Sequence, residues 1–462
     1  MTGQDTIAAL ATPPGTGGIG IIRVSGPLAE SIAYRLFKPK NNIITFASHH
    51  LYHGDLISPE SGIVIDEVLL ALMKKPGSYT GEDTLEISCH GGFLVLQAVL
   101  KEVIAAGCRP AAPGEFTQRS FLNGRLDLAQ AEAISDLIMA KTDRGRELAL
   151  SHLKGRLSQA VEDLRQEIIA ALAFLEADID FSEEEISRAV DNRTATYDGT
   201  LKDVIGKLAA LLATYEQGKV FRGGANVVLA GKPNVGKSSL LNALLGEKRA
   251  IVAPLPGTTR DFIEEYINIA GAPIKLTDTA GIRPPANSIE EQGIALMREK
   301  LVAADLIIMI VDGSATLTVE DREIMDALGD RMRLLAVNKA DLPQKIDLEE
   351  VKTVLLNIDV LAISAKYGQG IDRLKAAIYQ ALLGTPGDRQ PEVMIANARH
   401  KHALEKTVAY LSRAREGIRN DLPAELIAIE IRDALASLGE MVDRTTNEEV
   451  LEQIFSRFCI GK

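Results

Sequence analysis

The stretch GKPNVGKS (231–238) decides the fold of the segment around it. It follows the apolar run ANVVLA (225–230) and leads into SSLLNALL (238–245), so a strand, a Gly-rich loop and a helix are expected in that order. This is the phosphate-loop pattern G-x-x-x-x-G-K-[ST] in the context that the pattern requires. Its glycines let backbone N–H groups turn towards phosphate oxygens at a helix N-terminus, which favours anions. We expect Lys237 to reach the β- and γ-phosphates and the hydroxyl group of Ser238 to bind Mg²⁺.

Three further motifs follow in order, each at the end of a β-rich run. DTAG (278–281) places Asp278 near the expected Mg²⁺ shell. NKAD (338–341) supplies Asp341, whose carboxylate can accept hydrogen bonds from N1–H and the 2-amino group of guanine but finds no such donors on adenine. SAK (364–366) would cover the edge of the base. Because doubly wound sheets bind ligands at the carboxyl ends of their strands, the four motifs together predict a guanine-nucleotide site.

The segment PLPGTTRD (254–261) lies between the first two motifs, and Thr259 is the candidate that completes the Mg²⁺ shell. The residues expected to contact GTP are Asn234, Val235, Gly236, Lys237, Ser238, Ser239, Ala253, Pro254, Leu255, Pro256, Gly257, Thr258, Thr259, Asp278, Thr279, Ala280, Gly281, Asn338, Lys339, Asp341, Ser364, Ala365 and Lys366.

Hydrolysis of GTP needs a device other than the glutamine of Ras-like proteins, because Ile282 follows DTAG and has no polar group. Asn234 could help to coordinate a monovalent cation beside the phosphates. Glu290 or Glu291 could orient the attacking water. From the residues alone both choices stay open, and they favour a solvated charge of the switch loop as the interpretation of Glu290. Lys237 and Glu290 are the candidate catalytic residues.

The alternation of strands and helices over 226–385 predicts an α/β unit with a parallel sheet covered on both faces. Before residue 118 the chain alternates β-rich runs such as 64–73 with one helix at 93–107, as in an α+β domain. Apolar residues recur every three or four positions from Leu153 to Leu175, which predicts one face of a single long helix. Helix is expected again after 392, with one starting at the Asp421 cap, so the α/β unit is expected to be inserted into a helical domain.

The chain has 462 residues, enough for roughly three domains of about 150 residues each. The expected boundaries are 1–118, 119–220, 221–385 and 386–462, with the second and fourth segments forming one helical domain. A formal net charge of −12 argues against a broad basic surface for nucleic acid. Three cysteines, no signal-peptide pattern and no run of ~20 apolar residues favour a reducing, cytoplasmic location without a membrane span.

Segments outside the nucleotide motifs resemble one family. ATPPGTGGIGIIRVSG (11–26), PGEFTQRSFLNGRLDLAQAEAI (113–134) and the tail FCIGK (458–462) are similar to the bacterial tRNA modification GTPase family MnmE, also called TrmE. The resemblance covers essentially the whole chain. The glycines at 15–20 formally match G-x-G-x-x-G, but they lead into a strand instead of a helix, so the dinucleotide interpretation fails.

The resemblance implies an N-terminal domain that binds a tetrahydrofolate derivative (5-formyl- or methylene-tetrahydrofolate) and forms a homodimer. It implies that the protein acts with MnmG, an FAD-dependent partner, in a heterotetramer or larger complex. Together they would form the carboxymethylaminomethyl-type modification at C5 of the wobble uridine in certain tRNAs.

The resemblance also assigns residues. Arg23, Glu82, Arg125 and Lys462 occupy positions similar to folate contacts, and Cys459 matches a functional cysteine of the tail. Asn234, Ala253, Leu255 and Thr258 match the ligands of a potassium ion, and Glu290 matches a water-orienting glutamate. The alternative is an Era-like GTPase of ribosome assembly, which shares the Asn234-type loop. Such a protein should carry a basic RNA-binding appendage, whereas this chain is acidic and ends in CIGK.

Overall fold

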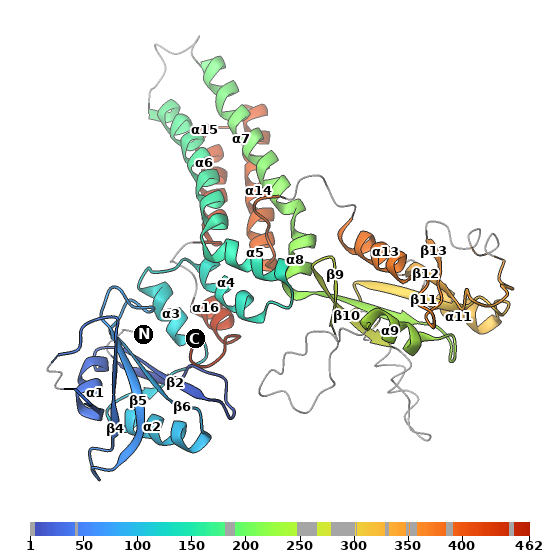
Figure 1. The fold of residues 1–462 in the computed structure, drawn as a ribbon. Helices are drawn as coiled ribbons and strands as arrows, with labels where there is room; N and C mark the ends of the chain where they lie inside the picture. Colours follow the sequence, from blue (N-terminus) through green and yellow to red (C-terminus); the bar gives the residue numbers. More distant parts are fainter. Residues whose placement is uncertain are drawn as a thin grey trace, which may run out of the picture.

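The structure, a computed structural model, describes residues 5–41, 45–180, 190–246, 266–278, 301, 303–328, 332–347, 351, 358–384, 391–442 and 448–462. Figure 1 shows an N-terminal unit of sheet and helices, a helical unit with long helices from two distant parts of the chain, and an α/β unit beside them. The chain is therefore multidomain, with an α+β N-terminal unit and an α/β unit inserted into an all-α unit, as the sequence predicts. No helix among the described residues is apolar enough over a sufficient length to cross a membrane.

Within the described residues, the N-terminal unit forms a seven-stranded sheet of order β3-β4-β5-β6-β2-β1-β7. Its strands are β1 (Ile7–Leu10), β2 (Ile19–Ser25), β3 (Phe37–Pro39), β4 (His50–Ile57), β5 (Val64–Met73), β6 (Thr84–His90) and β7 (Arg109–Pro110). Alternate residues of β2, Ile22 and Val24, enter a core covered by α1 (Ala29–Leu36) and α2 (Phe93–Ala105). Arg23 consequently lies on the opposite face, paired in register with Glu86 of β6.

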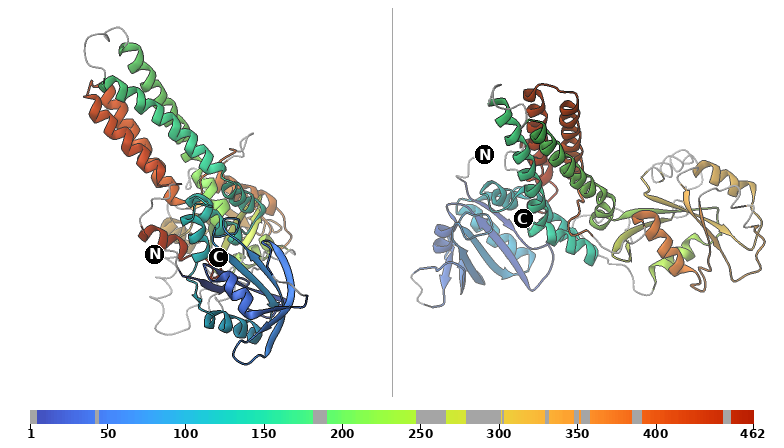
Figure 2. Two further views of the ribbon diagram at one scale, coloured as in Figure 1. Left: turned by 90° about the vertical axis from the view of Figure 1, so that its left-hand side faces the viewer. Right: turned by 90° about the horizontal axis from the view of Figure 1, so that it is seen from above.

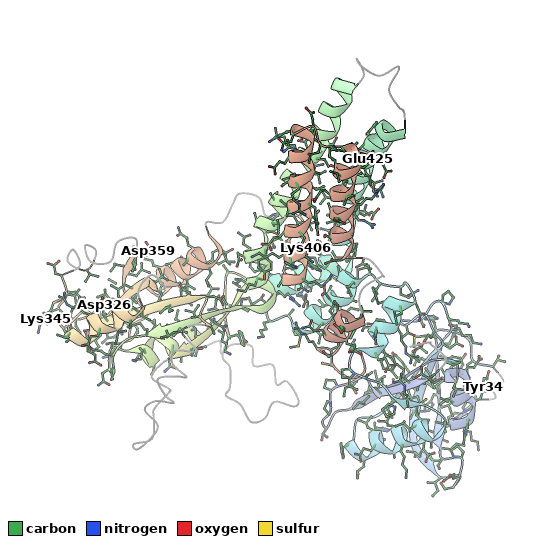
Figure 3. All side chains as sticks on the ribbon, turned by 180° about the vertical axis from the view of Figure 1, so that it is seen from behind. Tyr34, Asp326, Lys345, Asp359, Lys406 and Glu425 are labelled. Carbon is green, nitrogen blue, oxygen red and sulfur yellow. The ribbon has the colours of Figure 1, made fainter. Side chains whose placement is uncertain are left out.

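Four long helices pack around the core of the helical unit (Figure 2). They are α6 (Arg156–Asp180), α7 (Val190–Ala213), α14 (Ala398–Arg419) and α15 (Ala424–Gly439). The shorter helices are α3 (Glu115–Leu122), α4 (Leu128–Met139), α5 (Asp143–Leu153), α8 (Tyr215–Gly223) and α16 (Glu448–Phe455). In Figure 3, Lys406 and Glu425 mark this unit, Tyr34 marks the N-terminal unit, and Asp326 and Asp359 mark the α/β unit.

Two helix boundaries differ from the expected ones. The chain breaks between α5 and α6 because Gly155 adopts a φ of 78°, the left-handed conformation that commonly ends helices. The residues from Leu157 to Leu175 do line the core of the helical unit, but Leu153 packs against a different apolar cluster. Asp421 also takes a positive φ, of 50°, so α15 begins after Pro423 without an aspartate cap.

The described part of the α/β unit forms a six-stranded sheet of order β13-β12-β11-β8-β10-β9. Its strands are β8 (Ala225–Ala230), β9 (Tyr266–Ile269), β10 (Ala272–Asp278), β11 (Leu306–Asp312), β12 (Met332–Asn338) and β13 (Asp359–Ala362). β9 pairs antiparallel with β10, and the other pairs are parallel. One face packs against α9 (Lys237–Leu245) and α13 (Ile371–Leu383), and the other packs against α11 (Val319–Leu328).

Helix α4 contacts both segments through which the chain passes between the helical unit and the α/β unit. Asp136 accepts a hydrogen bond of 2.7 Å from Nε of Arg222, near the end of α8. Glu132, one turn earlier, accepts hydrogen bonds from Asn397 at 2.9 Å and from Nη2 of Arg399 at 2.8 Å, where the chain returns. Two carboxylates of one helix therefore fix the segments that enter and leave the α/β unit.

The C-terminal segment returns to the N-terminal unit. Phe455 and Phe458 pack in one apolar cluster with Phe121 and Leu128. Gly461 has a φ of 94°, and a Cβ at this position would lie 2.3 Å from the backbone oxygen of Leu10. Only a glycine allows the tail to approach β1 so closely.

Candidate functional site

The phosphate-loop motif forms the expected strand, loop and helix. β8 ends at Ala230, and α9 begins directly after Gly236. Gly231, Asn234 and Gly236 have φ values of 146°, 63° and 100°, so the loop turns through left-handed conformations. Successive N–H groups in such a turn form a concave anion-binding surface at the start of a helix.

Lys237 already lies within this loop. It is 5% exposed, and its Nζ donates hydrogen bonds of 2.7 Å and 2.8 Å to the backbone oxygens of Gly231 and Lys232. Ser238 and Ser239 follow in the first turn of α9 and are exposed. The loop thus presents an ammonium group and a hydroxyl group at the N-terminus of one helix, as a phosphate with its Mg²⁺ requires.

Asn338 joins the NKAD motif (338–341), which we call the base loop, to the phosphate loop. Its Nδ2 donates to the backbone oxygen of Val235 at 2.8 Å, and its Oδ1 accepts from the backbone N–H of Ala365 at 3.0 Å. A Cβ at Gly236 would lie 2.2 Å from Nδ2 of Asn338, so a side chain at 236 would displace this contact. Residues from three of the predicted motifs therefore meet at one buried amide.

Asp341 is oriented by the SAK motif (364–366). Its Oδ1 accepts a hydrogen bond of 2.5 Å from the hydroxyl group of Ser364. Lys339 has a φ of 64° and donates to Oδ2 of Asp312 at 2.6 Å. The carboxylate expected to bind guanine is therefore held by Ser364, while Asp312 holds the neighbouring Lys339.

The motifs share one edge of the sheet. β8, β10, β11 and β12 run parallel and end at Ala230, Asp278, Asp312 and Asn338. Lys366 and Ser364 follow β13 at the same edge. This is the edge at which parallel α/β sheets bind their ligands.

The remaining candidates of this site lie outside the described residues. They are Ala253, Pro254, Leu255, Pro256, Gly257, Thr258, Thr259, Thr279, Ala280, Gly281, Glu290 and its alternative Glu291. The Mg²⁺ ligand Thr259, the potassium ligands other than Asn234 and the water-orienting glutamate therefore stay predictions.

A second cluster of candidate residues surrounds Arg23 on the sheet face away from α1 and α2. Its Nε donates to Glu86 at 2.9 Å, and its Nη1 donates to the backbone oxygen of Gly461 at 3.2 Å. Its guanidinium carbon lies 5.4 Å from the ring centre of Tyr79 and 5.7 Å from that of Phe116. These contacts join the N-terminal sheet to the tail of the chain.

Two cations meet there. Burial and the nearby charge of Arg23 lower the pKa of Lys462. Glu82 accepts a hydrogen bond of 2.7 Å from Ser25, two residues along β2 from Arg23. Arg125 donates to the backbone oxygen of Pro76 at 3.0 Å. Arg23 and Arg125 thus contact the loop of residues 76–82 that carries Glu82, and Lys462 lies near Arg23.

Comparison with known proteins covers both sites. A model of the GTP-binding protein TrmE N-terminus matches residues 6–125, and a model of the MnmE helical domain matches residues 128–459. The tRNA modification GTPase MnmE of Syntrophus aciditrophicus is 52% identical over 99% of this chain and 100% of its own length. That of Geobacter sulfurreducens is 45% identical over 99% of both chains.

The chain belongs to the MnmE family. The family resemblance stated from the sequence is therefore confirmed, and it extends over the units on both sides of the nucleotide loops.

Three residues near the candidate folate site of this MnmE-family chain were not found from the sequence. Arg119 is 7% exposed and donates to Glu82 at 3.1 Å and to Asp5 and Glu115 at 2.8 and 3.0 Å. Tyr79 and Phe116 flank Arg23 from two separate segments. No spacing or motif marks these residues, because their contacts form only when the sheet, α3 and the tail assemble.

The three cysteines differ in their exposure. Cys89 and Cys108 are buried, and burial raises the pKa of their thiols to about 11 and about 12, with Asp66 adding to the effect at Cys89. Cys459 is exposed. Of the three, only the tail cysteine is accessible to a partner.

Proposed function

We propose that this chain, a GTP hydrolase of tRNA modification, acts with a tetrahydrofolate one-carbon donor and the FAD-dependent partner MnmG. The hydrolase activity and the role in tRNA modification follow from the family, because this chain and each of the two relatives match over 99% or more of their lengths. The product is the carboxymethylaminomethyl-type group at C5 of the wobble uridine in certain tRNAs. The separation of two groups of residues supports two different substrates. The nucleotide motifs meet at one edge of the sheet in the α/β unit, and a second cluster, with cationic side chains, surrounds Arg23 on the N-terminal unit.

At the nucleotide edge, Lys237 holds the β- and γ-phosphates, and its two backbone acceptors show that its N–H groups point into the loop. The hydroxyl groups of Ser238 and Thr259 hold Mg²⁺. The side-chain oxygen of Asn234, with Ala253, Leu255 and Thr258, holds K⁺; Asn234 is exposed on its loop and can offer that oxygen. Bound Mg²⁺ and K⁺ supply positive charge against the phosphate oxygens.

Glu290 completes the catalytic arrangement in this proposal. A carboxylate can accept a hydrogen bond from the attacking water and so orient it towards the γ-phosphate, the role that Ile282 is unable to fill. Asp341 selects guanine by accepting hydrogen bonds from two adjacent donors of the base.

At the N-terminal cluster, the charges suit a tetrahydrofolate derivative. Arg23 and Lys462 offer two cations to the carboxylates of a folate tail, and Glu82 offers acceptors to the N–H groups of a pterin ring. Arg125 adds a further exposed cation at the rim. The side chains present thus fit the ligand in charge and in hydrogen-bonding capacity.

The N-terminal unit also carries the features of a homodimer surface. Ile19, Leu51 and Leu69 are 67%, 69% and 43% exposed. Each alternates with core-facing neighbours, so all three lie on the face of the sheet opposite α1 and α2. Exposed apolar side chains on one face of a sheet favour self-association.

We accordingly divide the chain into a folate-binding and dimerisation domain (1–118), a helical domain (119–220 and 386–462) and the GTPase domain (221–385). The Era-like alternative is not favoured, because the relatives match the units on both sides of the GTPase domain as well.

The test is reconstitution. The chain, its flavoprotein partner, GTP, a tetrahydrofolate donor and undermodified tRNA are combined, and the wobble uridine is analysed by mass spectrometry. We expect the modified nucleoside only when all components are present. A modified product in the absence of tetrahydrofolate would overturn the folate assignment, and the lack of GTP turnover would overturn the hydrolase.

A further inference from the structure

Two lysines of the nucleotide loops are held by aspartates from a segment that belongs to none of the four motifs. The segment runs from Asp312, the last residue of β11, to Asp321 in the first turn of α11; we call it the anchor segment. Nζ of Lys339 donates to Oδ2 of Asp312 at 2.6 Å. Nζ of Lys232 donates to Oδ2 of Asp321 at 2.7 Å. One segment therefore contacts both the base loop and the phosphate loop.

The phosphate-loop contact begins at a position that the motif leaves open. Lys232 is the first x of G-x-x-x-x-G-K-S, so phosphate binding does not itself require a cation there. The side chain of Lys232 is nevertheless only 18% exposed, and that of Asp321 is 2% exposed. The backbone oxygen of Lys232 accepts from Nζ of Lys237 at 2.8 Å. The ion pair thus fixes a residue that directly contacts the phosphate-binding lysine.

Asp321 is fixed in turn by the start of α11. It accepts a hydrogen bond of 3.0 Å from the backbone N–H of Thr318, and its own N–H donates to the hydroxyl group of Thr318 at 3.3 Å. This reciprocal arrangement is a capping box, which rigidly defines a helix start. Burial opposes ionisation of Asp321, but the hydrogen bonds from Lys232 and Thr318 outweigh it and lower its pKa. The aspartate is therefore charged at neutral pH.

The base-loop contact is equally constrained. Oδ1 of Asp312 accepts from the backbone N–H of Ser314 at 2.9 Å and from its hydroxyl group at 2.7 Å. The backbone N–H of Gly313 donates to the backbone oxygen of Asn338 at 2.8 Å. Lys339, which Asp312 holds, stands two residues before the guanine-reading Asp341 and has a positive φ that tertiary contacts must maintain.

We propose that Asp321 and Asp312 are positioning residues of the GTP site, the first acting through Lys232 on the phosphate loop and the second through Lys339 on the base loop. This inference rests on the proposed nucleotide site. Because the two contacts act on different loops, their loss should affect different parts of the nucleotide. Loss of the Lys232–Asp321 pair weakens recognition of the phosphates, and loss of the Asp312–Lys339 pair weakens recognition of the guanine 2-amino group.

The experiment measures the affinities of the full-length chain for GDP, GMP and IDP, which lacks the 2-amino group. For Lys232→Met we expect the preference for GDP over GMP to fall about tenfold, the loss of roughly one charge-assisted contact, with the preference for GDP over IDP unchanged. For Asp312→Asn we expect the reverse pattern. Lys232→Arg keeps the ion pair and should behave as the parent.

Two further variants control for the loss of a lysine elsewhere and for the unpaired charge that Lys232→Met leaves behind. Lys219→Met removes a lysine that pairs with Asp305 at 3.1 Å, just before the other end of the same strand β11, and should change neither preference. Lys232→Met leaves Asp321 charged and buried, so the double variant Lys232→Met/Asp321→Asn removes both charges while keeping a cap acceptor. It should show the same narrowed preference for GDP over GMP as the single variant.

The outcomes distinguish failure of the proposed GTP site from failure of the positioning role. If the parent binds no GDP, the proposed function falls and this inference falls with it. If the parent binds GDP but both variants keep both preferences, the anchor segment has no positioning role. If each variant loses both preferences equally, the ion pairs only stabilise the fold, and the inference is wrong.

Discussion

Glu132 of α4 and Arg399 at the start of α14 are joined by a hydrogen bond of 3.0 Å from Nε, although 267 residues separate them along the chain. The whole α/β unit lies between them in sequence, so this pair closes the helical unit behind the insertion. His400 is a second close neighbour, with Nε2 2.9 Å from the same carboxylate. Burial opposes ionisation of Glu132, but His400 and Arg399 outweigh it and hold its pKa well below the ordinary 4.5.

Glu132→Gln should therefore lower stability in a pH-dependent way. A carboxylate whose pKa is lowered by folding stabilises the protein above its unfolded pKa, and this contribution is lost as pH falls through the folded pKa. At pH 7 we expect a loss of about 3 kcal/mol, as for a broken buried ion pair, and the difference from the parent should shrink progressively below about pH 4.5. Urea unfolding at several pH values measures it.

The control is Asp198→Asn, which removes a pair with Arg415 whose side chains are 28% and 15% exposed. Because solvent screens that pair, its loss should cost less at pH 7. A Glu132→Gln deficit of equal size at every pH would contradict the electrostatic origin of the effect.

Asp341→Asn should exchange the nucleotide preference. The amide replaces one acceptor of the carboxylate by a donor, which opposes the guanine donors and suits the 2-oxo group of xanthine. We expect GTP affinity to fall on the order of 10²-fold and XTP affinity to rise above it. Competition binding measures both, with the exposed Asp359→Asn as the control; retention of GTP affinity by Asp341→Asn would remove the residue from the base site.

GTP turnover should depend on potassium. In the proposed site, oxygens of Asn234 and of residues 253–258 would hold K⁺, and Na⁺ would be too small for them. The parent should therefore be much faster in potassium than in sodium, and Asn234→Ala should lose this difference. Glu290→Ala should retain nucleotide binding and lose about 10²-fold in rate, the typical effect of one positioned polar group. Glu291→Ala is the matched control. Equal parental rates in the two salts would eliminate the cation, and a slow Glu291→Ala with a normal Glu290→Ala would transfer the role to Glu291.

Arg23→Ala should abolish folate binding and tRNA modification while GTP hydrolysis stays near the parental rate. The reason is that Arg23 contacts Glu86 of the N-terminal unit and Gly461 of the C-terminal tail, and none of the described nucleotide loops. Fluorescence titration with a tetrahydrofolate derivative provides the measurement, and Arg35→Ala, an exposed arginine of α1, provides the control. Loss of GTPase activity with folate binding intact would show that the assignment is inverted.

Alkylation should modify Cys459 alone in the native chain. With pKa values of about 11 and about 12, Cys89 and Cys108 carry on the order of 10⁻³ thiolate or less at pH 8, and both are buried. Iodoacetamide treatment at pH 8 followed by peptide mass spectrometry should find one modified cysteine, and three after denaturation. Native modification of Cys89 would indicate that the N-terminal core opens.

The elements with strong local patterns were predictable from the sequence. The run 64–73 forms β5 with the same ends, because alternating apolar residues bounded by turn residues favour a strand wherever they pack. The long helix was predicted through Gly155, where the periodicity continues but a positive φ ends the first segment. The local pattern carries no information on that turn.

Residues of the candidate sites were likewise predictable where a motif marks them and not elsewhere. The motifs place Lys237, Asn338 and Asp341 at one edge, because strand order and ligand chemistry are linked in parallel sheets. The ion pair between Lys232 and Asp321 joins two positions that no motif restricts. Such contacts depend on how separate segments assemble, and a single sequence gives no signal for them.

The contact between Arg23 and Gly461 also bears on biosynthesis. Its two residues are 438 positions apart, so Arg23 leaves the ribosome long before its partner. During translation the sheet of the N-terminal unit must wait, with its Arg23 face uncovered, while the helical and α/β units emerge. The nucleotide site is therefore synthesised in full before the N-terminal cluster can close, and a nascent chain acquires its two candidate activities in the reverse of their order along the sequence.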